Sequence, residues 1–199
     1  LGAVFPSEVG PCLLLDVGAN ADCKPGYLVQ FAWMGSAYLK GAFGVPDPRV
    51  GLLNIGAEEG KGSQLAQAAY KLLQESKLPF VGNVEAQDIP KGNAQVVVTD
   101  GFTGNITIKT AEGVADFFFA RLRETLTGRL HYRLAAAILQ SALTAAARRL
   151  DYTEYGGAPL LGVQGLVIIA HGRSNAHAVQ QAILVAQHAA EGNVVERIR

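Results

Sequence analysis

Short apolar runs that end in glycine or asparagine turns and lead into helical patterns are the feature that most constrains this chain. One of these runs, residues 12–17, stops at Gly18-Ala19-Asn20. Such runs are typical of strands buried on both faces of a parallel sheet. We expect five strands, at residues 13–17, 50–55, 80–84, 96–99 and 166–170. Their alternation with helices predicts an α/β fold with one mostly parallel sheet and helices on both faces.

The helical patterns complete this organisation. We expect helices from Pro25 to the glycines at 41 and 44, from Ser63 to about residue 75, from Ile106 to about 127, from Leu130 to about 150, and after Asn175. The first six residues show no obvious element. Neither an internal repeat nor a low-complexity linker divides the chain, so residues 1–199 are expected to form a single α/β domain. Within it, residues 106–150 are expected to form a projecting helical pair.

Composition excludes several classes of protein. The 17 basic residues balance the 17 acidic ones, so no overall field attracts nucleic acid, and we expect no nucleic-acid partner. A 49% hydrophobic share favours a globular chain over a disordered one, and no apolar run is long enough to span a membrane. Cys12 and Cys23 lack the spacing of redox or zinc motifs, which favours free thiols in the cytoplasm. The histidines have no metal-ligand spacing, so we expect no metal and no cofactor.

The candidate ligand site lies where the strands end. In an open parallel sheet, ligands bind beyond the carboxyl ends of the strands, where glycine permits close approach and helix N-termini favour anions. Polar and glycine residues follow each expected strand. The residues proposed to bind substrate are Asn20, Gly60, Gly62, Ser63, Asp100, Gly104 and His171.

Lys61 stands two residues before the expected helix cap Ser63. Its loop differs from a phosphate-binding P-loop, because only three residues separate Gly56 from Gly60 and Gly62 follows the lysine. Lys61 and the helix N-terminus can still hold a single phosphate, although a solvated loop lysine is the commoner case. The dinucleotide and esterase signatures G-x-G-x-x-G and G-x-S-x-G are absent from the sequence.

Five sequence strings, taken together, resemble the PlsX family, the bacterial phosphate acyltransferases of phospholipid synthesis. They occur in order from about residue 13 to the C-terminal helix, at residues 15–20 (LDVGAN), 48–56 (PRVGLLNIG), 80–85 (FVGNVE), 100–105 (DGFTGN) and 155–158 (YGGA). The resemblance implies a Rossmann-like fold similar to the isocitrate and isopropylmalate dehydrogenases. It also implies a cytoplasmic homodimer that can associate peripherally with membranes.

The resemblance further implies a reaction and its residues. The family converts acyl-[acyl-carrier-protein] and inorganic phosphate into acyl phosphate and free carrier protein. Lys61 and Asn105 match its proposed catalytic residues. Phosphate attack on a thioester needs a held anion, which Lys61 can supply, and a donor to the carbonyl oxygen, which the Asn105 amide can supply. His171 is a secondary candidate to assist.

This chain departs from the family at its start. Family members carry upstream a further stretch with D-A-M-G-G-D and S-A-G-N-T-G motifs, and neither occurs here. We therefore expect the N-terminal part of the family fold to be missing. Two alternatives remain, a phosphotransacetylase-like enzyme that uses acyl-coenzyme A and a catalytically incomplete fragment that only binds ligand.

A basic stretch carries the last expectation. Residues 121–149 hold six of the ten arginines and one acidic residue, with apolar positions at helical spacing. An ordinary core helix is one interpretation. The other is a projecting pair of helices that meets an acidic carrier protein or anionic lipid, or forms a dimer contact.

Overall fold

The computed structural model describes residues 1–150, 156–170, 172 and 174–199, without the side chains of 148–150. A five-stranded sheet has the order β1-β2-β5-β3-β4. Its strands are β1 (Gly2–Ser7), β2 (Gly10–Leu15), β3 (Val50–Leu53), β4 (Phe80–Val84) and β5 (Val96–Val98). β2, β5, β3 and β4 are parallel neighbours, and β1 pairs antiparallel with β2. The mostly parallel α/β sheet that the sequence predicts is therefore present.

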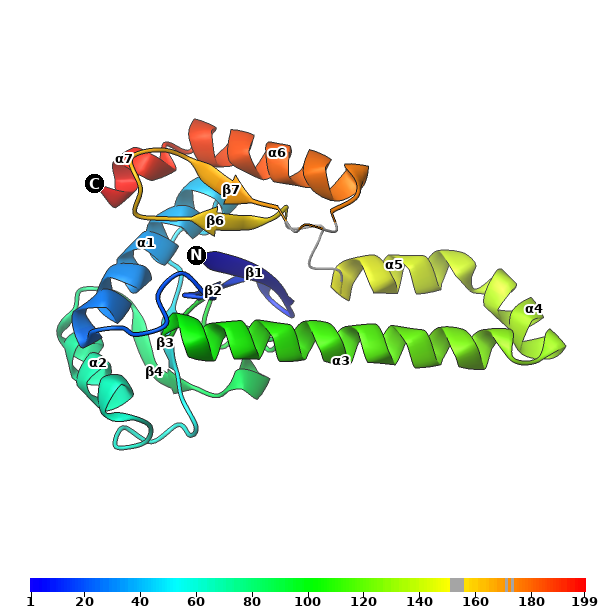
Figure 1. Cartoon of the computed structure of the whole chain (residues 1–199), viewed down its shortest axis with the longest axis horizontal. Coiled ribbons are helices and arrows are strands. Elements are labelled where there is room, and N and C mark those ends of the chain that lie inside the picture. The colour runs from blue at the N-terminus through cyan, green and yellow to red at the C-terminus, as the bar shows by residue number, and fades with distance from the viewer. Residues whose placement is uncertain (151–155, 171, 173) are drawn as a thin grey trace.

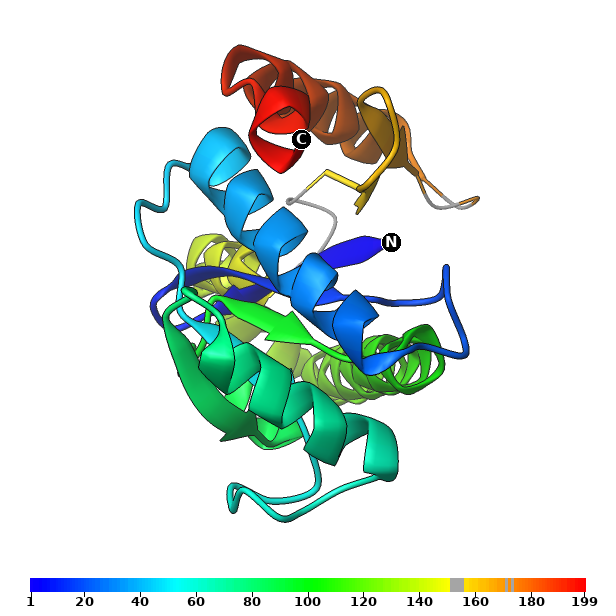
Figure 2. The ribbon, with the colours of Figure 1, turned by 90° about the vertical axis from the view of Figure 1, so that its left-hand side faces the viewer.

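Alternating strand residues build a core on each face of the sheet. Leu13, Leu15 and Val96 pack into one buried cluster, and Leu14 and Val97 into another. The first cluster contains residues of α1 (Pro25–Phe43) and α2 (Gln64–Glu75), which lie side by side in Figure 2. Ile108 of α3 (Gly101–Thr127) packs against the second cluster, which also contains Ile89 after the short 3₁₀ helix Ala86–Asp88. Helices thus cover both faces.

The expected fifth strand does not join this sheet. β7 (Val167–Ile169) pairs antiparallel with β6 (Ala158–Leu160) in a separate two-stranded sheet. The prediction was wrong because apolar character identifies a strand without identifying its partner, and a neighbouring segment close in sequence completes a hairpin. α6 (Ala176–Glu191) and α7 (Val194–Ile198) follow this hairpin and pack against α1, above the main sheet in Figure 1.

Two further elements differ from the sequence prediction. β1 occupies the start of the chain, where no element was expected. It lies at the edge of the sheet, where a proline such as Pro6, which has no backbone N–H to donate, is tolerated. α3 begins at Gly101 rather than Ile106, because Asp100 caps its first turn. Gly104 and Asn105 therefore lie on the helix rather than in the loop before it.

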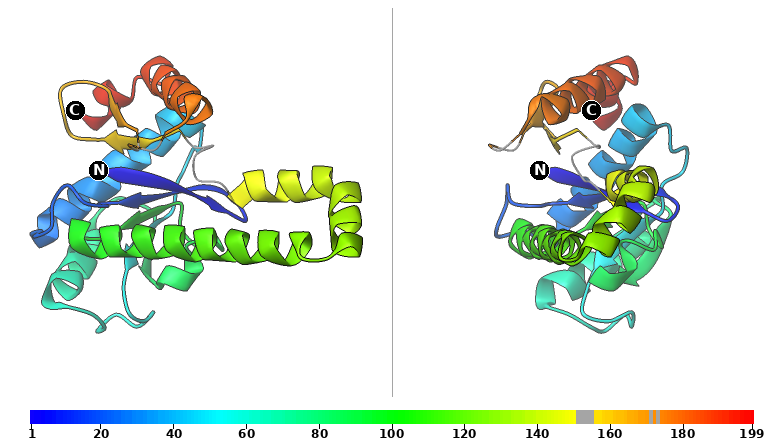
Figure 3. Two further views of the ribbon diagram at one scale, coloured as in Figure 1. Left: turned by 45° about the vertical axis from the view of Figure 1, so that its right-hand side comes forward. Right: turned by 90° about the vertical axis from the view of Figure 1, so that its right-hand side faces the viewer.

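The last turns of α3 extend past the sheet. α4 (Leu130–Ile138) follows at the tip, and α5 (Gln140–Leu150) runs back toward the body, as Figures 1 and 3 show. The single helix expected over 130–150 is interrupted at Leu139, whose backbone leaves the helical region. The apolar side chains of this part are open to solvent: Leu134, Ile138 and Leu139 are 61%, 82% and 54% exposed.

Candidate functional site

The carboxyl ends of β3 and β5 and the first turns of α2 and α3 surround one cavity of about 280 Å³, here called the α2–α3 cavity. Three of the predicted site residues, Gly62, Ser63 and Asp100, line it together with Asn54 and Thr103. This is the position expected for a ligand in an open parallel sheet. These three residues therefore lie together at the edge of the sheet that the sequence indicated, and the ligand site there stays a prediction.

Both helices at this cavity begin with a side-chain cap. Ser63 Oγ accepts a hydrogen bond from the Ala66 amide at 3.2 Å. Asp100 accepts from the amide of Thr103 at 2.7 Å and from its hydroxyl at 2.8 Å. The two ends differ in charge, because the cap of α2 is neutral and the cap of α3 is a carboxylate. The start of α2 is consequently the better place for an anion.

The loop before α2 is held by side-chain amides. Gln67 Nε2 donates to the carbonyls of Gly60 and Gly62 at 2.9 and 3.1 Å, and Asn54 Nδ2 donates to the Lys61 carbonyl at 3.0 Å. Gly62 has a φ of +88°, and a Cβ there would overlap the Asn54 side chain. Glycine is required at 62 for both reasons. The sequence prediction missed the anchoring roles of Asn54 and Gln67, for which the only signal was an asparagine directly after a buried strand.

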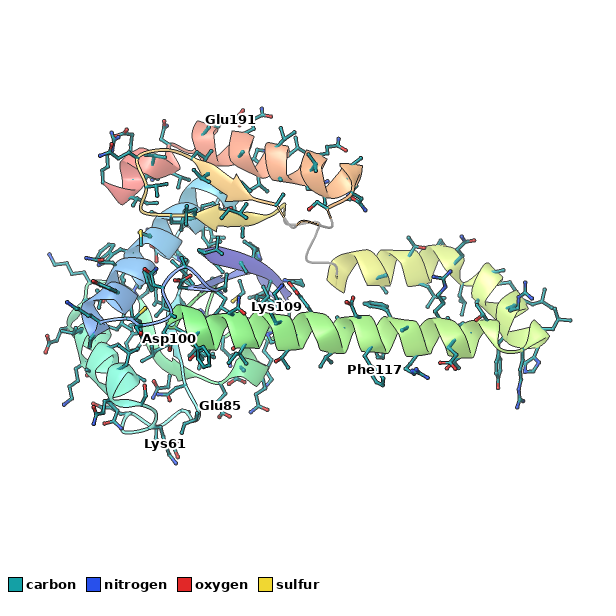
Figure 4. The ribbon with its side chains drawn as sticks, in the orientation of Figure 1. Lys61, Glu85, Asp100, Lys109, Phe117 and Glu191 are labelled. Atoms are coloured by element: carbon teal, nitrogen blue, oxygen red, sulfur yellow. The ribbon has the colours of Figure 1, made fainter. Side chains whose placement is uncertain are left out.

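The Lys61 side chain extends away from the sheet. Its ammonium lies 4.0 Å from a Glu58 carboxylate oxygen, and the side chain is 52% exposed. Figure 4 shows Lys61 at the outer end of its loop, on the far side from α3. The exposed pair with Glu58 adds little stability, so the lysine is free to exchange partners.

A buried carboxylate organises the loop after β2. Asp16 is fully buried and accepts hydrogen bonds from the backbone amides of Gly18, Ala19 and Asn20 at 3.0, 3.0 and 2.7 Å, and from the Asn20 side chain at 2.9 Å. Burial alone would raise the pKa of Asp16, but the hydrogen bonds from Ala19 and Asn20 and the N-terminal ammonium, 3.1 Å from Oδ1, lower it overall. Asn20 in turn accepts from the Gly101 amide at 2.8 Å through its carbonyl. The loop is thereby fastened to the start of α3.

Asn105 is fixed by the same loop. Its Nδ2 donates to the Val17 carbonyl at 3.0 Å, and within the part of the chain that the structure describes, the second N–H and Oδ1 have no partner and can meet a ligand. The loop approaches so closely because residue 104 is glycine: a Cβ there would overlap the Asp16 carbonyl oxygen. Gly104 therefore acts as a contact surface for the loop, and the Asp16 loop determines where the Asn105 amide points.

Asn105 lines a different cavity from Ser63. This second cavity, the α3–α6 cavity, has about 280 Å³ and is mostly apolar, with walls from β1, α3, β7 and α6. Thr103 and Asn105 are two residues apart on α3, which turns their side chains about 200° from each other. Asn105 lines the α3–α6 cavity, whereas Lys61 lines neither cavity, so the structure does not bring the two predicted catalytic residues together.

His171, the remaining predicted residue, lies outside the residues that the structure describes. Among the described residues, no cluster of three or more histidine, cysteine, aspartate or glutamate side chains could hold a metal ion. No helix in the described ranges is long and apolar enough to cross a bilayer.

The fold and this edge together define an α/β protein with a cavity at the carboxyl ends of its parallel strands, where the start of α2 favours an anion. A sequence-family model described as "Fatty acid synthesis protein" matches residues 1–197. The chain belongs to this family, which confirms the resemblance to the PlsX phosphate acyltransferases noted in the sequence.

Curated relatives agree over nearly the whole chain. The phosphate acyltransferase of Desulfitobacterium hafniense (strain Y51) is 50% identical over 197 residues, which are 98% of this chain and 59% of that protein. Those of Moorella thermoacetica and Dictyoglomus thermophilum are 50% and 51% identical, covering 94% and 89% of this chain and 55% and 53% of theirs. The chain thus spans less than two thirds of the length of these relatives.

The likeness to solved structures is more remote. EutD phosphotransacetylase from Staphylococcus aureus has 22% sequence identity and a TM-score of 0.44, covering 58% of this chain and 42% of that one.

Proposed function

We propose that this chain carries the catalytic edge of a phosphate acyltransferase. The enzyme would transfer an acyl group from the thioester of acyl-[acyl-carrier-protein] to inorganic phosphate. The observation that supports this most strongly is the identity of about half of the residues, over 98% of the chain, to a protein named phosphate acyltransferase. The carrier protein and inorganic phosphate are accordingly the proposed substrates.

In the proposed reaction, a phosphate oxygen attacks the thioester carbonyl carbon. The new C–O bond forms as the C–S bond breaks, the thiolate leaves with the sulfur, and the phosphate proton passes to the thiolate or to water. Neither a protein nucleophile nor a cofactor is needed, because thiolate is a good leaving group. Catalysis then depends on positioning and on stabilising the charge of the carbonyl oxygen.

The phosphate would bind at the start of α2. The neutral Ser63 cap, the free backbone amides of the first turn and the flanking glycines Gly60 and Gly62 favour a single anion there. Lys61 would turn from Glu58 toward this anion, which its exposed side chain and weak ion pair permit. Asp100 would keep the anion away from α3 by charge repulsion.

The acyl group would bind on the other side of the first turn of α3. The α3–α6 cavity supplies apolar walls, and Asn105 supplies one unused N–H at its rim for the thioester oxygen. The thioester would lie at the first turn of α3, between the two cavities. It would there be next to the Asp16 loop, which includes Asn20 and packs against Gly104. His171 is retained as a proposed assisting residue.

The donor distinguishes the proposed function from its alternatives. The chain is incubated with phosphate and either acyl-[acyl-carrier-protein] or acyl-coenzyme A, and acyl phosphate is trapped with hydroxylamine. Faster product formation from the carrier-protein thioester supports the proposal. Preference for acyl-coenzyme A indicates the phosphotransacetylase-like alternative, and no product from either donor identifies a ligand-binding fragment.

We further propose that residues 1–199 act as one α/β domain of the isocitrate and isopropylmalate dehydrogenase-like class, from which residues 106–150 project as a helical pair. Solvent exposure of Leu134 and Ile138 supports a surface that meets a partner rather than a core helix. The proposed partners are a second copy of the chain, the carrier protein or anionic lipid, in a cytoplasmic protein that associates peripherally with membranes.

Charge reversal tests this surface. In Arg129→Glu/Arg133→Glu, co-sedimentation with anionic vesicles and binding to the carrier protein should both weaken, and salt should weaken wild-type binding. Lys77→Glu, on a loop of the α/β body, is the matched control. If neither interaction responds to salt or to the paired substitution, the basic patch has no binding role.

A further inference from the structure

A third cavity lies at the opposite edge of the sheet, where β3 and β4 begin. It has about 370 Å³ and is here called the α1–α7 cavity. Val50 donates its amide to the Pro79 carbonyl at 3.0 Å beside it, which places the cavity at the amino ends of the strands. The residues that matter here are Trp33, Ser36, Lys40, Asp47, Leu78 and Arg197.

α1 presents one wall of this cavity. Trp33, Ser36 and Lys40 recur at spacings of three and four and so share a helix face. α7 forms the facing wall because the backbones at Gly41 and Gly192 touch: a Cβ on Gly192 would overlap the Gly41 carbonyl. This close approach brings two short segments, far apart in sequence, around one space.

The wall that α1 forms contains a buried hydroxyl, that of Ser36, without a hydrogen-bond partner among the described residues. Ser36 is 5% exposed, and its Oγ makes no hydrogen bond within the described part of the chain. Leaving a buried hydroxyl unpaired costs on the order of 1–3 kcal/mol. Because Ser36 lines the cavity, a ligand or a bound water there would satisfy it.

The cavity is also cationic. Arg197 uses Nε to donate to the Gly192 carbonyl at 2.8 Å, and its two terminal nitrogens have no hydrogen-bond partner among the described residues. Lys40 Nζ lies 3.4 Å from Asp47, whose side chain is 87% exposed. A guanidinium and an ammonium on different elements suit a phosphate group, with Asp47 as a weak competitor for the lysine.

The remaining wall is aromatic. The indole of Trp33 is 51% exposed, although it lines a cavity with apolar neighbours such as Leu78. An exposed indole stacks with planar rings and places a heteroaromatic group at low conformational cost. The volume of the α1–α7 cavity, about 370 Å³, falls within the usual range for sites that bind small molecules.

From these observations we propose that the α1–α7 cavity binds a nucleoside monophosphate, with its base on Trp33 and its phosphate between Arg197 and Lys40. The hydroxyl of Ser36 hydrogen-bonds to the bound nucleotide. The site is separate from the proposed acyl-transfer edge and does not depend on the proposed function, so it would act as an effector site.

The single tryptophan of the chain makes the test direct, because all tryptophan fluorescence comes from this cavity. Fluorescence excited at the red edge of indole absorption is titrated with adenosine 5′-monophosphate, adenosine or inorganic phosphate. We expect saturable quenching by the monophosphate, with at least about tenfold weaker responses to adenosine and to phosphate, each of which lacks one contact. Phosphate binding as tightly as the nucleotide, or no response to any of the three, would overturn the proposal.

Three variants locate the effect. Arg197→Gln should weaken nucleotide binding about tenfold, whereas Arg199→Gln, on the same terminal segment outside the cavity, should not change it. Ser36→Ala should weaken binding several-fold without lowering the melting temperature of the free chain, because the unpaired hydroxyl is removed. Equal affinity in wild type and Arg197→Gln would contradict the placement of the phosphate.

Discussion

The contact between Gly104 and the Asp16 carbonyl gives the sharpest stability prediction. An alanine Cβ at 104 would overlap that backbone oxygen, and neither backbone can move easily. The Asp16 amide donates to Thr99 at 3.0 Å, and the Gly104 amide donates to Asp100 at 2.9 Å. Overpacking costs about 1–3 kcal/mol, and a backbone overlap belongs at the upper end. After the gain of about 1 kcal/mol from replacing a helical glycine, Gly104→Ala should lower the free energy of unfolding by about 2 kcal/mol.

Gly113 is the matched control, because it lies on the same helix and a Cβ there would meet no atom within 4 Å. Gly113→Ala should therefore raise the free energy of unfolding by about 0.5–1 kcal/mol. Urea denaturation followed by circular dichroism measures both variants against wild type. The reasoning is refuted if Gly104→Ala is as stable as wild type, or if both alanine variants shift the midpoint in the same direction.

Three shorter predictions follow from single contacts. Because its folded-state pKa is lowered, the Asp16 carboxylate stabilises the folded chain above the ordinary aspartate pKa of about 3.9, and this stabilisation is lost as pH falls through the folded-state pKa. Asp16→Asn should therefore flatten the acid limb of the stability profile, and an unchanged acid limb would contradict this. Burial raises the pKa of Cys12 to about 12, so a thiol reagent should label Cys23 in the native chain and Cys12 only after denaturation. Ser63→Ala should cost about 1 kcal/mol in urea denaturation through the lost α2 cap, and an unchanged midpoint would contradict that role.

Local sequence predicted those parts of the fold that local physics controls. The runs that became β2, β3 and β5 were found because strands buried on both faces are continuously apolar. The edge strand β4, Phe80–Val84, was found with its observed bounds. The start of α3 was placed five residues late, although Asp100 and Thr103 carried a capping signal. Pairing partners were not available from the same information, so β7 was assigned to the wrong sheet.

The candidate site shows the same division. Residues that follow buried strands pointed to one edge of the sheet, and Gly62, Ser63 and Asp100 meet there. The direction of the Asn105 side chain depends on how α3 is rotated about its axis. Successive residues of a helix differ in direction by about 100°, so the sequence does not tell which face of α3 carries Asn105 unless the start of the helix is known. The buried Asp16 carboxylate that holds the neighbouring loop is likewise a result of tertiary packing.

The kinetics of acyl phosphate formation in two alanine variants test the central claim most directly. Asn105→Ala should lower kcat about 100-fold or more with little change in KM for phosphate, because it removes a donor to the carbonyl oxygen. Lys61→Ala should mainly raise KM for phosphate, and Lys71→Ala on the exposed surface of α2 should change neither constant. Melting temperatures within a few degrees of wild type separate these effects from unfolding. Full activity in Asn105→Ala or in Lys61→Ala would contradict the proposed site.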